Sequence, residues 1–261
     1  MSRFEELELK LGDVIAHVSP ARGALVTSLS VGGTELLFLN RDTFDDPARN
    51  VRGGIPLLFP FAGSLKDNLL AATGTTIRQH GFAREQPWSV IERHPGSIRM
   101  AWESNAATEA VFPWRHRLEH SLHLVERGLH VELLIHNLSE TPMPISPGWH
   151  PYFNCPVEQK ELVSGNVPGT EAGNVHDRAE VNYGVVAPAE GRSSHRVPGL
   201  GIIQLSFSPE MRHLQIWTMP GQAFICIEPF AGAPDSINNP GTRAILPGEA
   251  RVLWMRMETE V

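Results

Sequence analysis

Two histidines and one glutamate stand in segments unlike the rest of the chain. His80 lies in the string QHGFAR, His150 in GWHPYF and Glu228 in IEPF. Each string places an ionisable side chain among aromatic residues, glycine and proline, as in a cleft that presents a few polar groups on an apolar wall. A carboxylate and imidazoles suit general acid–base chemistry near neutral pH, because they can hold opposite protonation states. We therefore expect these three side chains to line one cleft.

Taken singly, each of these residues also has a plain structural explanation. A lone histidine is often a satisfied core or surface residue, and a lone glutamate is usually solvated. His150 and Glu228 share a further feature, because each directly precedes a proline, whose ring favours an extended backbone at the preceding residue. The combination, rather than any one residue, indicates a site.

Other catalytic motifs are absent from the sequence or do not fit it. The chain has no GxxxxGK[ST], GxGxxG or GxSxG string, so phosphate-loop, dinucleotide and α/β-hydrolase sites lose their main support. Residues 116–120 spell HRLEH, a zinc-like HxxEH, but this run alternates like a strand, where four residues span about 13 Å. Two histidines so far apart cannot share one zinc. We expect no metal and no cofactor.

The elements that must position these residues follow a period of two, which is typical of half-buried strands. Residues 7–11, 25–31, 98–103, 118–124 and 129–135 alternate in this way, and Gly32-Gly33 predicts a hairpin whose second strand runs through 34–39. A second hairpin is expected at residues 118–135. Further strands fit 202–207, 214–218, 223–228 and 252–257.

These strands predict an all-β protein, a large antiparallel two-sheet β-sandwich or a barrel, with only short helical turns. No helical pattern of ten or more residues and no linker composition interrupts the chain, so residues 1–261 are expected to form a single domain. The stretch 158–198 is rich in Gly, Pro, Asn and Ser and is predicted to contain long loops.

Composition narrows the possible partners and the compartment. The 261 residues carry a net charge of −7 with no basic block, which disfavours binding to nucleic acid. The start MSRFEELELK does not have the pattern of a secretory signal, and no apolar run is long enough to cross a membrane. We expect a cytoplasmic protein without a membrane partner, in which Cys155 and Cys226 are reduced and buried.

Together these strings resemble the aldose 1-epimerase (mutarotase) family, whose fold is a large antiparallel β-sandwich. The resemblance spans nearly the whole chain in the expected order, through Leu11-Gly12, Ser19-Pro20, GTELL (33–37), HGFAR (80–84), WHPYF (149–153), MPG (219–221), CIEPF (226–230) and LPGE (246–249). It implies an isomerase that interconverts the α and β anomers of an aldose. By the family pattern Glu228 is the base that deprotonates the anomeric hydroxyl, His150 is the acid that protonates the ring oxygen, and His80 binds the sugar near that oxygen.

The resemblance leaves the substrate open. Galactose-type members carry a different first loop, whereas RGGIP and the arginine of HGFAR resemble members that act on hexose 6-phosphates, in which two arginines hold the phosphate. Arg52 and Arg84 occupy those positions, although Arg52 could equally be structural. The string LLFPFAGSLKDN also resembles a further branch whose sugar is not defined. Asp177 is the candidate for the acidic residue that contacts sugar hydroxyls.

Two other functions fit the same sequence features. A non-catalytic carbohydrate-binding sandwich would use the same aromatic cleft, with exposed aromatics such as Trp149, but would not need an acid–base pair. A glycoside hydrolase or lyase would need a second carboxylate across the cleft, for which Asp177 is the candidate. The sequence defines neither the sugar, the preferred anomer nor the oligomeric state.

Overall fold

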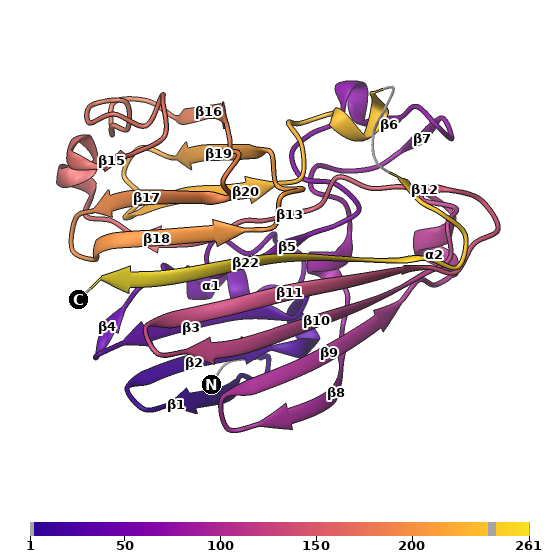
Figure 1. Cartoon of the computed structure of the whole chain (residues 1–261), viewed down its shortest axis with the longest axis horizontal. Helices are drawn as coiled ribbons and strands as arrows, with labels where there is room; N and C mark the ends of the chain where they lie inside the picture. Colours follow the sequence, from indigo (N-terminus) through magenta and orange to yellow (C-terminus); the bar gives the residue numbers. More distant parts are fainter. Residues whose placement is uncertain (1–2, 240–243, 261) are drawn as a thin grey trace.

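A computed structural model of the chain describes residues 3–239 and 244–260, and within these ranges it is built from antiparallel strands (Figure 1). The largest sheet has eight strands, and its long members cross the middle of the molecule in Figure 1. In spatial order it contains β15 (Ser164–Gly165), β17 (Arg192–Val197), β18 (Gly201–Phe207), β22 (Ala250–Glu260), β11 (Gly128–Asn137), β10 (His116–Val125), β9 (Ser97–Glu103) and β8 (Ser89–His94).

Two further sheets complete the architecture. One has four strands, in the order β1 (Leu7–Leu11), β2 (Val14–Ser19), β3 (Leu25–Val31) and β4 (Thr34–Glu35). The other follows the order β16 (Val181–Val186), β19 (His213–Thr218), β20 (Phe224–Phe230), β13 (Gly148–Trp149) and β5 (Leu57–Leu58), with β14 (Tyr152–Asn154) also paired to β20. Short two-stranded ladders join β6 (Leu69–Leu70) to β7 (Thr75–Thr76) and β12 (Met143–Pro144) to β21 (Ala244–Ile245).

Helices are short wherever the structure describes the chain. The α-helices are α1 (Arg41–Asp45) and α2 (Ala106–Glu109), and the 3-10 helices are η1 (Pro20–Arg22), η2 (Lys66–Asn68), η3 (Ala83–Glu85), η4 (Val157–Leu162) and η5 (Ser236–Asn238). None of these helices is long and apolar enough to cross a membrane. The predicted all-β sandwich with only short helical turns is therefore confirmed.

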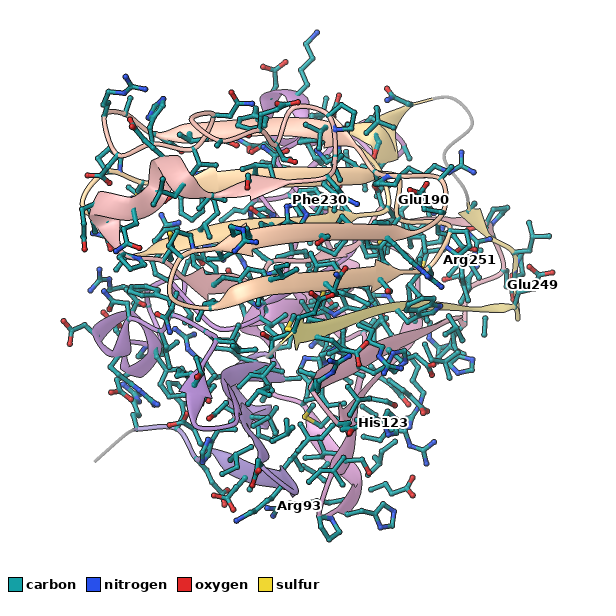
Figure 2. All side chains as sticks on the ribbon, turned by 60° about the vertical axis from the view of Figure 1, so that its left-hand side comes forward. Arg93, His123, Glu190, Phe230, Glu249 and Arg251 are labelled. Atoms are coloured by element: carbon teal, nitrogen blue, oxygen red, sulfur yellow. The ribbon has the colours of Figure 1, made fainter. Side chains whose placement is uncertain are left out.

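Period-two alternation sets both the register and the core. In the β10–β11 hairpin, Leu118 lies opposite Ile135 and Leu122 opposite Val131, and all four side chains are buried. They belong to one hydrophobic cluster that also takes side chains from the four-stranded sheet and from β19 and β20. Burial of such apolar surface is the main stabilising contribution to folding, so the three sheets share one core. In Figure 2 the labelled Phe230 lies among the packed strands, while the exposed Arg93 and Glu249 lie toward the edge.

Strand β20 connects this core to the chemistry. Because successive side chains of a strand point to opposite faces, Ile225 and Ile227 pack into the main core while Phe224, Cys226 and Glu228 face the other way. Phe224 and Cys226 form a separate small cluster with Tyr152 and Trp217. The strand thus carries apolar anchors on one face and an ionisable side chain on the other.

Some expectations about the elements need correction. The hairpin at Gly32-Gly33 is present, but its returning strand β4 covers only residues 34–35 of the expected 34–39. The stretch 158–198, predicted to contain long loops, has no strand or helix over residues 166–180 but also contains two six-residue strands, β16 and β17. The partner of β16 is β19, well after it in the chain, while β17 forms a hairpin with the next strand, β18, and buries the polar Ser193 and His195. The domain prediction includes residues 1–2, 240–243 and 261, which lie outside the described ranges, and it stays a prediction.

The HRLEH run lies in β10, as its alternation indicates, and not in a helix. His116 is buried and its Nδ1 lies 2.7 Å from the carbonyl oxygen of Trp114, while His120 Nε2 accepts a hydrogen bond from Trp149 Nε1 at 3.4 Å. Burial lowers the pKa of His116 to about 4 and that of His120 to about 3, so both imidazoles are neutral core residues. Both cysteines are free and buried, in agreement with the prediction.

Candidate active site

The three predicted acid–base residues line one cleft of about 250 Å³, together with both predicted arginines. His80, His150, Glu228, Arg52 and Arg84 are separated by up to 176 residues in sequence (228 − 52), yet all five contribute to its wall. Other lining residues are Asn50, Ser64, Gln79, Tyr152, Glu180, Asn182, Gln215, Trp217 and Phe230. The structure thus brings together the residues that the sequence marks, while their catalytic roles stay predictions.

Glu228 occupies the outer face of β20, opposite Gln215 of β19. Its side chain is 1% exposed, and burial raises the pKa of its carboxyl group well above the usual value, an effect that nearby Arg84 only partly offsets. Its Oε2 atom is buried without a hydrogen-bond partner. An unpartnered carboxylate oxygen is costly to bury, so its presence at the base of a cleft points to a function.

His150 is held between β13 and β14 by the backbone. Its N–H donates to the carbonyl oxygen of Pro56 at 3.0 Å, which ties the segment to the first glycine-rich loop. Gly148, two residues before His150, lies so close to Phe230 that an added Cβ would come 2.5 Å from that ring. Side chains alternate here too, so Trp149 is fully buried against His120 while the His150 imidazole lines the cleft.

His80 adopts a left-handed backbone conformation, with φ of 69°. Two hydrogen bonds to Gly63 hold it there: the His80 N–H donates to the Gly63 carbonyl at 2.8 Å, and the Gly63 N–H donates to His80 Nδ1 at 3.0 Å. Because Nδ1 accepts the hydrogen bond from the Gly63 N–H, it carries no proton, and the ring proton of neutral His80 resides on Nε2. The fold therefore selects the tautomer whose Nε2–H is the donor that His80 can offer a ligand.

The imidazole of His150 and the carboxyl group of Glu228 form a close buried pair. His150 Nε2 lies 3.3 Å from Glu228 Oε2, and the His80 and His150 rings are 5.5 Å apart. Burial, with smaller contributions from Arg84 and Arg52, lowers the pKa of His150 well below its usual value, and burial likewise lowers that of His80. Burial thus favours the neutral form of each group. Because the two groups are adjacent, a proton that passes from one to the other leaves the net charge of the pair unchanged.

Two arginines flank this pair. The exposed Arg52 lies over the ring of Trp217, with its guanidinium carbon 5.1 Å from the ring centroid. Arg84 is half-buried in η3, where one guanidinium nitrogen donates to the Gln79 carbonyl at 3.1 Å and the Nε atom has no partner. Both guanidinium groups border the cleft and retain donors for an anionic ligand.

Aromatic side chains shape the other wall. The Tyr152 ring stacks on His150, with centroids 4.6 Å apart and planes within 7°, and Trp217 meets His150 edge-on at 5.6 Å. The Trp217 indole N–H donates to Glu180 at 2.7 Å. These contacts fix the plane of the His150 ring. Trp149, expected to be an exposed aromatic for sugar binding, is instead in the core, and the tryptophan that lines the cleft is the largely buried Trp217.

Asp177 is not brought into the cleft. Its Oδ1 accepts hydrogen bonds from Lys160 Nζ at 2.6 Å and from the Gly221 N–H at 2.9 Å. The Lys160 side chain is fully buried, and a buried ammonium group needs a carboxylate partner. Glu180 is the acidic residue that lines the cleft in its place. Its signal in the sequence was its spacing of two from Asn182: Glu180 directly precedes β16, and both side chains line the cleft.

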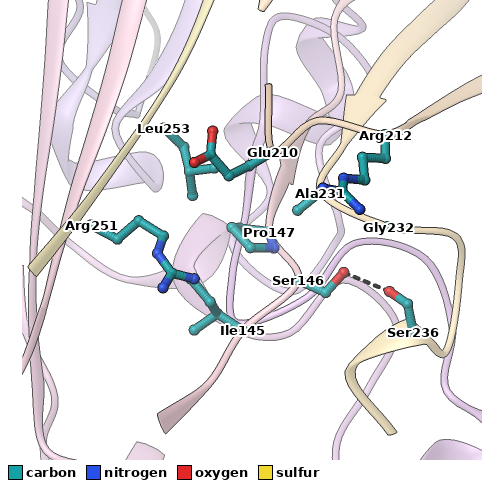
Figure 3. A pocket seen from close by; sticks show the side chains of 10 residues that line it. All are labelled: Ile145, Ser146, Pro147, Glu210, Arg212, Ala231, Gly232, Ser236, Arg251 and Leu253. Carbon is teal, nitrogen blue, oxygen red and sulfur yellow. Dashed lines mark hydrogen bonds between the residues drawn. The ribbon is translucent and has the colours of Figure 1, made fainter. Parts of the chain in front are cut away.

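A second cavity, of about 160 Å³, is lined in part by the segment that follows β20, at Ala231 and Gly232 (Figure 3). Its wall includes Glu210, Arg212, Arg251 and the hydrogen-bonded pair Ser146 and Ser236, whose hydroxyl oxygens are 2.7 Å apart. No histidine is among its described lining residues, so it does not offer the imidazole–carboxyl pair. We therefore take the first cleft as the candidate active site.

The aldose 1-epimerase family model matches residues 7–183. The chain therefore belongs to the aldose 1-epimerase family. This agrees with the isomerase class that the sequence resemblance implies.

Relatives of known name or structure agree in fold. The chain is 29% identical to the solved Slr1438 protein from Synechocystis sp. PCC 6803, with a TM-score of 0.91 and coverage of 99% of this chain and 97% of that one. It also aligns with a solved protein from Escherichia coli K12, provisionally named an aldose 1-epimerase, at 20% identity and a TM-score of 0.81, covering 98% of this chain and 99% of that chain.

Curated relatives match over part of their length. A protein from Escherichia coli (strain K12), provisionally named glucose-6-phosphate 1-epimerase, is 28% identical over 172 residues, which cover 62% of this chain and 54% of that protein. Protein LacX from Lactococcus lactis subsp. lactis is 30% identical over 118 residues, covering 42% of this chain and 39% of that protein. The alignments thus span between about two fifths and one half of these two relatives.

Proposed function

We propose that the protein is a mutarotase that interconverts the α and β anomers of a hexose or hexose 6-phosphate by general acid–base ring opening. The observation that carries this proposal is the buried His150–Glu228 pair at the base of a cleft, 3.3 Å apart and with unpartnered polar atoms on both residues. Membership of the aldose 1-epimerase family supports it independently.

The geometry suits a reaction at one carbon. The anomeric hydroxyl and the ring oxygen of a pyranose are bonded to the same carbon, so acid and base must converge on neighbouring atoms. In the proposed reaction Glu228 takes the proton of the anomeric hydroxyl while His150 gives a proton to the ring oxygen, and the bond between that oxygen and C1 breaks. Rotation about the bond between C1 and C2 and closure on the other face return both protons.

His80 has a separate part in this scheme. Because its Nδ1 accepts from the Gly63 N–H, its Nε2–H is free to donate to the sugar near the ring oxygen. A preorganised donor at an atom that gains negative charge stabilises the transition state more than the ground state. The pKa of His80 is lowered by burial, so the group serves as a neutral donor rather than as a cation.

Arg52 and Arg84 support a phosphorylated substrate. Both line the cleft that holds the acid–base pair, and the planar guanidinium fork matches a phosphate dianion. With the sugar C1 at His150 and Glu228, the 6-phosphate would bind between the two arginines. A free aldose would instead meet the same guanidinium groups through its hydroxyls, and this is the alternative that an experiment must separate.

The non-catalytic alternative is less consistent with the cleft. A binding module gains nothing from burying a glutamate whose carboxyl oxygen has no partner, since that costs stability. The glycosidase alternative relied on Asp177 as the second carboxylate, and Asp177 pairs with Lys160 outside the cleft. Glu180 also lines the cleft, but its carboxylate accepts a hydrogen bond from Trp217, and the group beside Glu228 is the imidazole of His150.

An anomerisation assay across free and 6-phosphorylated hexoses tests the substrate. Each arginine–phosphate hydrogen bond contributes about 1.5–3 kcal/mol, so Arg52→Ala or Arg84→Ala should lower kcat/KM roughly ten- to a hundredfold, at about 1.4 kcal/mol per decade. We expect this loss on glucose 6-phosphate and little change on glucose. Equal losses on both sugars would assign the arginines to hydroxyl binding or to structure and make the protein a free-aldose mutarotase.

A further inference from the structure

A third side chain with metal-binding chemistry lies beside the acid–base pair. Cys226 precedes Glu228 by two residues on β20, so both project from the same face of that strand. One ligand atom each from His150, Cys226 and Glu228 lies within 4.8 Å of the other two. Within residues 3–239 and 244–260 this is the one group of three such side chains.

We propose that His150, Cys226 and Glu228 form a binding site for a thiophilic divalent cation such as Zn²⁺, and that occupation of this site inhibits the enzyme. An imidazole nitrogen, a thiolate sulfur and a carboxylate oxygen are the three ligand types that zinc takes in proteins. Two of these residues, His150 and Glu228, line the cleft, whereas Cys226 is fully buried and is not among its lining residues. We refer to these three residues as the His-Cys-Glu cluster.

The unpartnered polar atoms favour this proposal. Glu228 Oε2 and His150 Nδ1 are both buried without a hydrogen-bond partner. A cation at the cluster therefore meets buried polar atoms that lack hydrogen-bond partners, next to the Cys226 thiol.

Two features oppose binding and set the choice of metal. Arg52 and Arg84 place positive charge near the cluster, and the Cys226 thiol is fully buried, which raises its pKa well above the usual value. Zinc compensates for this because coordination deprotonates a thiol outright, as the S–H bond is replaced by a Zn–S bond and one proton passes to solvent. Mg²⁺ prefers oxygen ligands and gains nothing from the sulfur.

Inhibition follows from the overlap of ligands and catalytic groups. A metal that holds the Glu228 carboxylate and a His150 nitrogen removes the lone pairs that the proposed mechanism needs. It also occupies the position of the anomeric hydroxyl. Metal and sugar should therefore compete. Binding at the cluster is independent of the proposed function, whereas inhibition rests on it, so the two are measured separately.

Direct binding is tested with Co²⁺ as a spectroscopic probe. Co²⁺ added to the metal-free protein should produce near-ultraviolet charge-transfer absorption from a cysteine thiolate, which excess Zn²⁺ removes. Cys155→Ala is the matched control, since Cys155 is also free and buried but lies outside the cluster. The signal should persist in Cys155→Ala and vanish in Cys226→Ala. No thiolate absorption in the wild type, or its loss in Cys155→Ala alone, would overturn the site.

Inhibition is tested by anomerisation rates in the presence of Zn²⁺, with Mg²⁺ as the comparison cation. We expect competitive inhibition by Zn²⁺, reversal by a chelator, and a midpoint at least roughly tenfold higher in Cys226→Ala than in Cys155→Ala. An unchanged midpoint in a folded Cys226→Ala, or inhibition that sugar does not relieve, would contradict the proposal. If Cys226→Ala fails to fold, Cys226→Ser serves as the closer isostere, and the wild-type Co²⁺ spectrum still decides whether a thiolate is bound.

Discussion

At the scale of single residues, burial sets the protonation of the site. It lowers the pKa of His150 below its ordinary 6.5 and raises that of Glu228 above its ordinary 4.5. Both shifts favour the state in which the pair holds one proton and both groups are neutral. The Glu228 carboxylate with His150 imidazolium, required for turnover, is one arrangement of that single proton.

The pH dependence of kcat/KM follows from these directions. The acid limb reports protonation of His150, whose pKa is lowered, so activity should fall only well below pH 6.5. The alkaline limb reports loss of the last proton from the pair, and the raised pKa of Glu228 moves it well above pH 4.5. We expect a broad plateau through neutrality, measured by exchange NMR. An acid limb centred at pH 6.5, as for a solvated histidine, would contradict the buried-pair assignment.

Residue types show how far the sequence predicts the site. The strings around His80, His150 and Glu228 identified three side chains that the fold brings together, because glycine, proline and aromatic neighbours mark a cleft. Asp177 lies outside the cleft, paired with the buried Lys160, and only tertiary packing defines that partner. Trp149 was misassigned for a similar reason, since strand alternation gives the cleft to His150 and the core to Trp149.

At the scale of elements, the turn that carries His80 depends on glycine at position 81. Gly81 has φ of 66°, and an added Cβ would lie 2.1 Å from the carbonyl oxygen of Phe59. Gly33 has φ of 83° with nothing within 4 Å of an added Cβ. The two positions share a left-handed backbone and differ in the space around it.

Alanine substitution at these two positions separates strain from steric clash. Gly33→Ala should cost about 1–2 kcal/mol of unfolding free energy from the backbone conformation alone. Gly81→Ala should cost more, because Phe59 must also move, and it should impair activity by displacing His80. Urea unfolding and anomerisation rates of both variants check this. Equal destabilisation would mean that the close approach to Phe59 is unimportant.

Element prediction succeeded for the long apolar hairpin and failed for two shorter strands. The β10–β11 hairpin was readable because its two strands adjoin in sequence and share one apolar face. Strand β17 also adjoins its partner β18, but its buried face carries Ser193 and His195, so it has no apolar alternation to read. Strand β16 lies among glycine, proline and asparagine, and its partner β19 follows well after it in the chain.

At the scale of the whole molecule, one hydrophobic cluster joins the sheets that carry the site. It draws side chains from the eight-stranded sheet, the four-stranded sheet and β19–β20. The sheets should therefore unfold together, as one domain. Far-ultraviolet circular dichroism and tryptophan fluorescence should give coincident urea transitions. Two separated transitions would indicate units that fold independently and would contradict the single-domain prediction.

The central claim is that Glu228 and His150 transfer the protons of ring opening. Anomerisation rates by exchange NMR test it in Glu228→Gln and His150→Asn, which preserve shape and polarity, with Glu92→Gln at an exposed site as the matched control. We predict that each active-site variant loses roughly 10²–10⁴-fold in rate, the usual contribution of a positioned proton-transfer group, while the control is unchanged. Near wild-type turnover in a folded Glu228→Gln or His150→Asn would contradict the account.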